Sequence, residues 1–139
     1  MIDEKVLGKM FVLVGMDKKK MHESLCQLGR PPDKCKDIWS PQRPTTGYCY
    51  VVTEVASYFM KKHSVPHKTY RLDLGNDESH WFVRLGKEGD GEIIDLTADQ
   101  TDEDYDYENA ERKEPYINQH SRTRMSDRAE ELARMMNLL

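Results

Sequence analysis

Hydrophobic residues recur at helical spacing in several parts of this chain. In residues 2–15 and again in Lys18–Leu28, apolar side chains return every three or four positions, which predicts two helices. A broader apolar stripe over Tyr48–Lys62 predicts a third helix that is buried on most sides. A last helix is predicted to begin at Ser126, and its apolar side carries Leu132, Met135, Met136 and Leu139.

Between the third helix and the last one, the pattern changes to short runs typical of strands. These runs are His67–Leu74, His80–Leu85 and Glu92–Leu96. Glycine-rich turn sequences at 75–77 and 86–91 separate them, so we expect an antiparallel meander. Together the elements predict an α+β fold, with a core helix packed on a small antiparallel sheet.

The length of the chain, 139 residues, favours one domain with a single core over residues 1–139. Within it we distinguish a helical N-terminal part (1–38), a core that carries the motifs (39–101), an acidic loop (102–125) and a C-terminal helix (126–139). The acidic, tyrosine-rich stretch Thr101–Glu114 is expected either to follow the surface or to be partly mobile.

Composition narrows the classes of function. The net charge of −4 gives no support for nucleic-acid binding, which usually shows as a basic excess. No stretch reaches the length of a membrane span, and the first residues lack the layout of a signal peptide, so we expect a cytoplasmic location and no membrane partner. The three cysteines include no Cys-x-x-Cys pair and are expected to be free thiols.

Three residues together suggest nucleophilic chemistry. Cys49 opens the predicted core helix, His80 begins a predicted strand, and Asp95 stands in the apolar strand sequence Ile-Ile-Asp-Leu. A helix N-terminus favours a thiolate and offers backbone N–H groups for an oxyanion. A thiol also needs a base, and the base needs a group that orients it. In a meander, His80 and Asp95 are able to meet side by side.

Each of the three residues also has a simpler interpretation. Cys49 alone is more often a small apolar residue in a core. His80 follows Asp-Glu-Ser and is able to cap a turn, whereas Asp95 is able to bind the Thr97 amide in an Asx-turn. We therefore predict the catalytic triad from the three residues in combination.

Further positions are expected to support the site. Gly47 lets the backbone turn sharply just before Cys49 and keeps the approach to its sulfur open. Trp81 either walls a substrate groove or fills the core. Thr45 or Thr46 is expected to cap the first turn of the core helix.

The sequence over about residues 39–101 resembles a known family. It contains Trp-x-Pro-x-x-Pro-x-x-Gly-x-Cys from Trp39 to Cys49, then Ser-His-Trp at 79–81, then Asp-Leu-Thr-x-x-Gln at 95–100. This order is similar to that of the YunG-like proteins, and by fold it resembles the papain-like and transglutaminase-like cysteine enzymes. The resemblance implies Cys49 as nucleophile, His80 as base and Asp95 as orienting residue. Gln42 stands a few residues before Cys49, where papain-like enzymes carry a glutamine that binds the oxyanion, so it is a candidate oxyanion donor or an ordinary surface glutamine.

Two functions are weighed. The first is a cysteine hydrolase or acyltransferase that needs no cofactor and acts on an amide, thioester or isopeptide bond of a protein, a peptide or another amide substrate. The second is a non-catalytic protein-interaction module on the same scaffold, in which the acidic segment Asp102–Glu108 either faces a basic partner or mimics the charge of a nucleic acid.

A metal site is not predicted. His63 and His67 are four residues apart, but Pro66 interrupts any helix face that they would share. Cys26 and Cys35 do not have the spacing of metal ligands.

Overall fold

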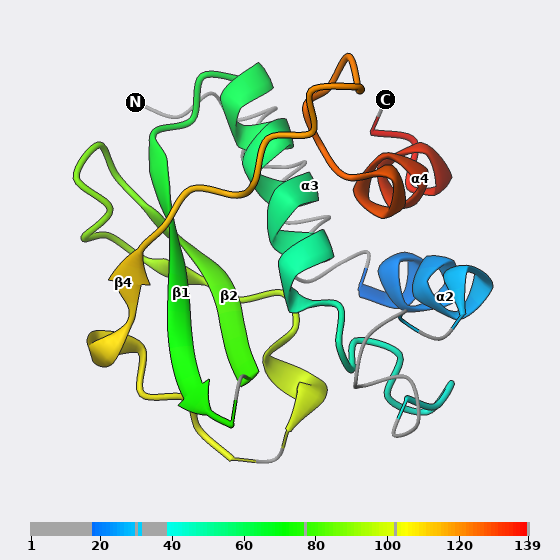
Figure 1. Cartoon of the computed structure of the whole chain (residues 1–139), viewed down its shortest axis with the longest axis horizontal. Helices are drawn as coiled ribbons and strands as arrows, with labels where there is room; N and C mark the ends of the chain where they lie inside the picture. The colour runs from blue at the N-terminus through cyan, green and yellow to red at the C-terminus, as the bar shows by residue number, and fades with distance from the viewer. Residues whose placement is uncertain (1–17, 30, 32–38, 77, 102, 139) are drawn as a thin grey trace.

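The computed structural model describes residues 18–29, 31, 39–76, 78–101 and 103–138. These residues form an α+β structure with a small antiparallel sheet, as predicted (Figure 1). The helices are α2 (Lys18–Leu28), α3 (Cys49–Lys62) and α4 (Asp127–Met135), with 3₁₀ turns η2 (Ala98–Gln100) and η3 (Tyr107–Asn109). The strands are β1 (His67–Gly75), β2 (Glu78–Leu85), β3 (Ile93–Ile94) and β4 (Glu111–Arg112).

The sheet has the order β3-β2-β1-β4, so the predicted meander of β1, β2 and β3 is confirmed. Strand β4 was not predicted, and it lies within the acidic loop. It pairs with β1 through Tyr70–Arg112 and Arg71–Glu111, and thereby extends the sheet on the edge away from β3. No helix within the described residues is both long enough and apolar enough to cross a membrane.

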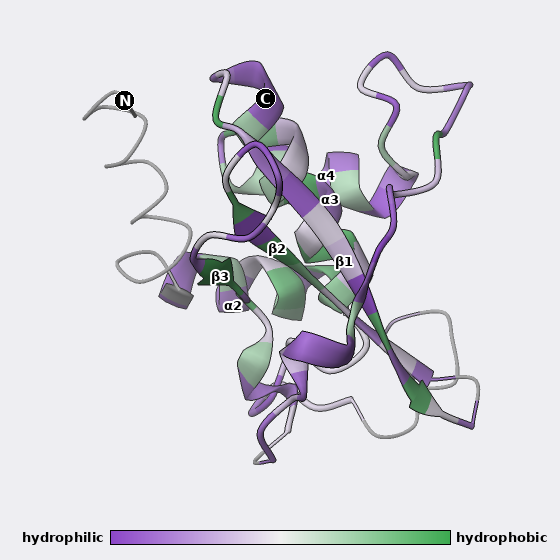
Figure 2. Cartoon of the chain, turned by 90° about the vertical axis from the view of Figure 1, so that its left-hand side faces the viewer, coloured by the Kyte–Doolittle hydropathy of each residue, from purple (hydrophilic) through white to green (hydrophobic). Residues whose placement is uncertain are grey.

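Helix α3 lies between the sheet on one side and the pair α2 and α4 on the other (Figure 1). Its apolar stripe is buried as predicted, because it faces a layer on both sides. Hydrophobic colour appears at β2 and β3, whereas most loops are hydrophilic (Figure 2). The core is built from Met21 and Leu25 of α2, Val52, Val55 and Phe59 of α3, Val83 and Ile94 of the sheet, and Ala129 and Leu132 of α4.

Two polar connections fix α4 to α3. Glu54 of α3 is buried and accepts hydrogen bonds from the backbone N–H of Ser126 (3.0 Å) and from its hydroxyl (2.7 Å). Ser126 is also the N-cap of α4, because its hydroxyl accepts from the Ala129 N–H. At the N-terminal end of α3, Arg128 donates to the hydroxyl of the buried Tyr48, which itself donates to the Gly29 carbonyl after α2.

The helical predictions are met to different degrees. Residues 18–28 and the core helix are confirmed, and Tyr48 is the N-cap residue of α3 rather than its first turn. The predicted helix at 2–15 lies outside the described residues. The stretch before α3 is irregular from Trp39 to Gly47, as expected, and Trp39 donates from its indole N–H to the Pro44 carbonyl.

Candidate active site

Cys49 is the first residue of α3, and its side chain lies at the open end of that helix. Tyr48 provides no side-chain cap. The predicted caps are wrong, since Thr45 donates instead to Asp99 (2.8 Å) and Thr46 to the Arg43 carbonyl (2.9 Å). The backbone N–H groups of the first turn therefore have no side-chain cap from these residues, and the positive end of the helix dipole acts beside the thiol.

Gly47 makes the turn that leads into α3. Its φ of +79° lies in the left-handed region, which glycine adopts without the steric cost of a side chain. The residue also lines the pocket in front of Cys49. Both roles agree with the prediction that Gly47 shapes the approach to the sulfur.

His80 and Asp95 meet through the pairing of β2 with β3. The register pairs Val83 with Ile94, so one further step places Asp95 opposite Phe82 and on the same face as His80. His80 Nε2 lies 2.6 Å from Asp95 Oδ2, and both side chains are almost fully buried. Asp95 Oδ1 also accepts the Thr97 N–H at 3.2 Å. The triad contact and the Asx-turn, which were alternatives for Asp95, occur together.

The pKa of His80 reflects this setting. Burial lowers the pKa of the ring, but hydrogen bonds and charge from Asp95 and Cys49 outweigh burial and raise it to about 9. Because Asp95 occupies Nε2, the nitrogen left to face the Cys49 thiol is Nδ1. The Cys49 sulfur also lies 3.7 Å from the Ser79 carbonyl, which places it beside the start of β2.

Gln100 connects the thiol segment to the base. Its side-chain oxygen accepts the Gly47 N–H at 2.9 Å. Its side-chain nitrogen lies 3.2 Å from His80 Nδ1 and 3.2 Å from Thr97 Oγ1. The carboxamide thus spans the loop before α3, strand β2 and the turn after β3.

Two tyrosines complete the surroundings of the triad. Tyr105 stacks face to face on His80, with ring centroids 3.7 Å apart and an angle of 5° between the rings. Tyr107 donates from its hydroxyl to Asp95 Oδ2 at 2.7 Å. The acidic loop therefore covers the imidazole and provides a further hydrogen bond to its orienting carboxylate.

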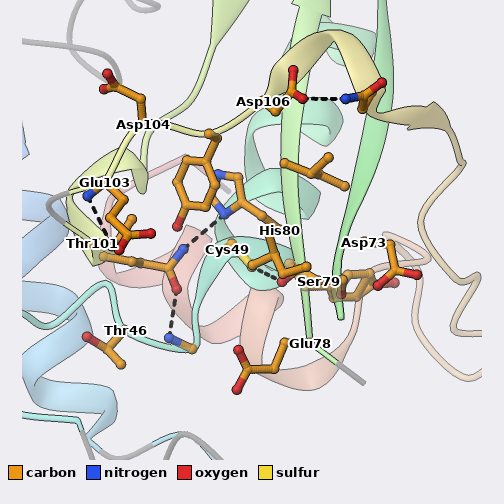
Figure 3. A pocket seen from close by; sticks show the side chains of 17 residues that line it. Thr46, Cys49, Asp73, Glu78, Ser79, His80, Thr101, Glu103, Asp104 and Asp106 are labelled. Carbon is orange, nitrogen blue, oxygen red and sulfur yellow. Dashed lines mark hydrogen bonds between the residues drawn. The ribbon is translucent and has the colours of Figure 1, made fainter. Parts of the chain in front are cut away.

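A pocket of about 690 Å³ opens in front of the Cys49 thiol. Figure 3 shows acidic side chains around it, with Cys49 and His80 between them. None of the described residues that line the pocket is a lysine or an arginine. The acidic lining residues are Asp73, Glu78, Glu103, Asp104 and Asp106.

The structure brings together some predicted site residues and separates others. Cys49, His80, Asp95 and Gly47 lie in one place. Gln42 is exposed and is not among the pocket-lining residues, so the glutamine of this site is Gln100. Trp81 is buried at 4 % exposure and packs edge-on against Tyr50 of α3, so it fills the interior and is not among the pocket-lining residues.

Gln100, Tyr105 and Tyr107 were not among the site residues predicted from the sequence. Gln100 was part of the family-like motif, and its place five residues after Asp95, beyond a tight turn, was the available signal. The two tyrosines lie in the acidic loop, and the path of this loop cannot be predicted from a periodic pattern in the sequence. No pattern in the chain distinguishes them from the other tyrosines.

The described residues contain no cluster of three histidine, cysteine or acidic side chains that could hold a metal ion. His67 instead lies 2.7 Å from the Ser57 hydroxyl through Nε2 and 2.8 Å from the Val65 carbonyl through Nδ1. Cys26 is a free thiol, and Cys35 lies outside the described residues.

Comparison of the chain with family models, with curated proteins and with solved structures gives no match.

Proposed function

We propose that this protein is a cysteine hydrolase or acyltransferase that acts on an amide, thioester or isopeptide bond. The observation that carries the proposal is the arrangement of Asp95, His80 and Cys49 at the uncapped N-terminus of α3, on a pocket large enough for a peptide segment. A papain-like or transglutaminase-like fold and kinship with the YunG-like proteins belong to the same proposal, on the strength of the motifs at 39–49, 79–81 and 95–100.

The reaction follows from the roles of the groups. His80 Nδ1 takes the proton of the Cys49 thiol, and the thiolate attacks the carbonyl carbon of the substrate. The backbone N–H of Cys49 binds the oxyanion that forms. His80 then gives the proton to the leaving amine or thiol, and the carbonyl group remains on Cys49 as a thioester. Water completes hydrolysis, or an amine completes transfer, and the free thiol returns.

The proposal also includes a substrate class and a cellular location. A protein or peptide substrate fits an open pocket of about 690 Å³ that has no lysine or arginine among its described lining residues. No cofactor is needed for the steps above. A cytoplasmic location, where thiols stay reduced, suits a free nucleophilic cysteine.

The test is the reactivity of Cys49 toward iodoacetamide as a function of pH, in a Cys26→Ser, Cys35→Ser background that isolates its signal. We expect Cys49 to be alkylated in the folded protein at about pH 7, because His80 and the helix N-terminus stabilise the thiolate. In His80→Ala the rate at about pH 7 should fall by roughly tenfold or more. The matched control is His120→Ala, an exposed histidine outside the pocket.

A Cys49 that reacts only in the unfolded protein would contradict the proposal. The alternative is then an interaction module, favoured by the exposed acidic side chains of Glu103, Asp104 and Asp106. This module would keep its fold and bind a basic partner equally well in Cys49→Ser.

A further inference from the structure

The orientation of the Gln100 carboxamide is determined by its neighbours. The backbone N–H of Gly47 can only donate, so the atom that faces it is the side-chain oxygen of Gln100. The amide nitrogen then faces Thr97 Oγ1 and His80 Nδ1, and it donates one N–H to each. Reversing the amide would set two donors against each other at Gly47.

This orientation constrains the base. An amide N–H at 3.2 Å from His80 Nδ1 needs a lone pair on that nitrogen, whereas an imidazolium has a proton there. Gln100 therefore favours the neutral ring with its proton on Nε2, where Asp95 accepts it. Asp95 and Cys49 act in the opposite direction, because both favour the charged ring.

We infer that Gln100 is a positioning residue that donates to the lone pair of His80 Nδ1, competes with the Cys49 thiol for that lone pair, and so limits the thiolate–imidazolium pair in the resting protein. The inference rests on the proposed function, since it concerns the same base and the same thiol. Its physical content is separate: Gln100 stabilises the neutral Cys49–His80 pair relative to the charged pair through one N–H donor. The other N–H and the Gly47 contact fix that donor in place.

Removal of this donor should change the alkylation rate of Cys49 in the direction opposite to that expected if Gln100 only held the structure together. Gln100→Met keeps the length of the side chain but has no N–H, so the charged pair is no longer opposed. We expect alkylation of Cys49 at about pH 7 to become about three- to tenfold faster, the range that one neutral hydrogen bond supports. A residue that only held His80 in place would, when replaced, make Cys49 slower.

The rise must depend on His80. In the double variant Gln100→Met, His80→Ala, the rate should equal that of His80→Ala alone. Gln119→Met is the matched control, because Gln119 is an exposed glutamine outside the pocket, and it should leave the rate unchanged.

A second measurement addresses the ring directly. In a Cys49→Ser background, the pKa of His80 is followed by NMR with and without Gln100→Met, and the same spectra report whether the fold is intact. Loss of a donor to the neutral ring should raise the pKa of His80 by about 0.5–1 unit.

The outcomes separate this inference from the proposed function. If Cys49 is alkylated rapidly and depends on His80, but Gln100→Met leaves the rate unchanged or lowers it and leaves the pKa of His80 in place, the inference on Gln100 is overturned alone. If wild-type Cys49 reacts only on unfolding, both are overturned. A faster Cys49 together with a raised pKa of His80 supports both.

Discussion

At the scale of single residues, Asp95 uses both of its oxygens. One accepts from His80 and Tyr107, and the other from the Thr97 N–H, so three hydrogen bonds fix the carboxylate. A buried carboxylate without such partners would cost several kcal/mol. Tyr105 stacks on the imidazole ring of His80 and keeps water from the face of the ring that it covers.

The titration of His80 leads to a prediction about stability. Its pKa is about 9 in the folded protein and about 6.5 in the unfolded chain. The ring therefore contributes stability that is fully present below about pH 6.5 and is lost as the pH rises through about 9. Over this pH range we expect the free energy of unfolding of the wild-type protein to fall by up to about 3 kcal/mol. The decline should shrink in His80→Gln, as measured by urea unfolding at several pH values; equal slopes in the two proteins would contradict it.

At the residue scale, the sequence predicted the place of a residue in the fold where the residue type and its neighbours in the chain determine that place. Cys49 at a helix start, Gly47 before it and Asp95 in an apolar strand are of this kind. Gln42 and Gln100 are chemically identical, and only the path of the loops decides which one reaches His80. Because that path depends on tertiary packing, the sequence did not distinguish them.

At the scale of elements, α3 depends on α4 for part of its burial and its polar partners. Glu54 and Tyr48 lie on or beside α3, and α4 supplies Ser126 and Arg128 to them. Burial raises the pKa of Glu54, and the two hydrogen bonds from Ser126 act against that rise. The periodicity of the sequence predicted both helices but not this contact, because it lies between residues 72 positions apart.

Ser126→Ala tests the contact between these helices. The variant loses the cap of α4 and one of the two hydrogen bonds to the buried Glu54, so we expect a loss of about 1–3 kcal/mol in unfolding free energy. Glu131→Ala, at an exposed position of the same helix, is the control and should change stability by less than about 0.5 kcal/mol. A similar loss in both variants would show that the connection to Glu54 contributes nothing specific.

Strand β4 shows the limit of pattern reasoning for elements. It has only Glu111 and Arg112, both exposed, and so it shows neither alternation nor an apolar run. Its pairing with β1 arises because the acidic loop returns along the sheet edge, where the Thr69 hydroxyl also donates to the Lys113 carbonyl (2.5 Å).

At the scale of the whole molecule, charge is unevenly placed. The chain has a net charge of −4, and acidic residues line the pocket that contains Cys49. Several carboxylates around a concave site produce an electric field that attracts cations and repels anions. These acidic residues stand in separate parts of the sequence, and only the fold brings residues from β1, β2 and the acidic loop to one opening.

Charged thiol reagents measure this field at Cys49. The cationic trimethylammonium-ethyl methanethiosulfonate should react faster with Cys49 than the anionic sulfonatoethyl methanethiosulfonate. At low salt, the ratio of the two rates should be about tenfold higher than the same ratio for free cysteine. The ratio should fall toward the free-cysteine value in about 0.5 M salt and in Glu78→Gln, Asp104→Asn. A ratio equal to that of free cysteine at low salt would show that the acidic side chains do not act on the thiol.

The attachment of α4 to α3 also has a consequence for biosynthesis. A chain is made from its N-terminus, so the thiol-bearing helix leaves the ribosome long before Ser126 and Arg128 do. Until then Glu54 and Tyr48 lack the partners that α4 supplies, and one side of α3 stays uncovered. The packing around α3, which carries Cys49, is thus completed only after α4 has emerged.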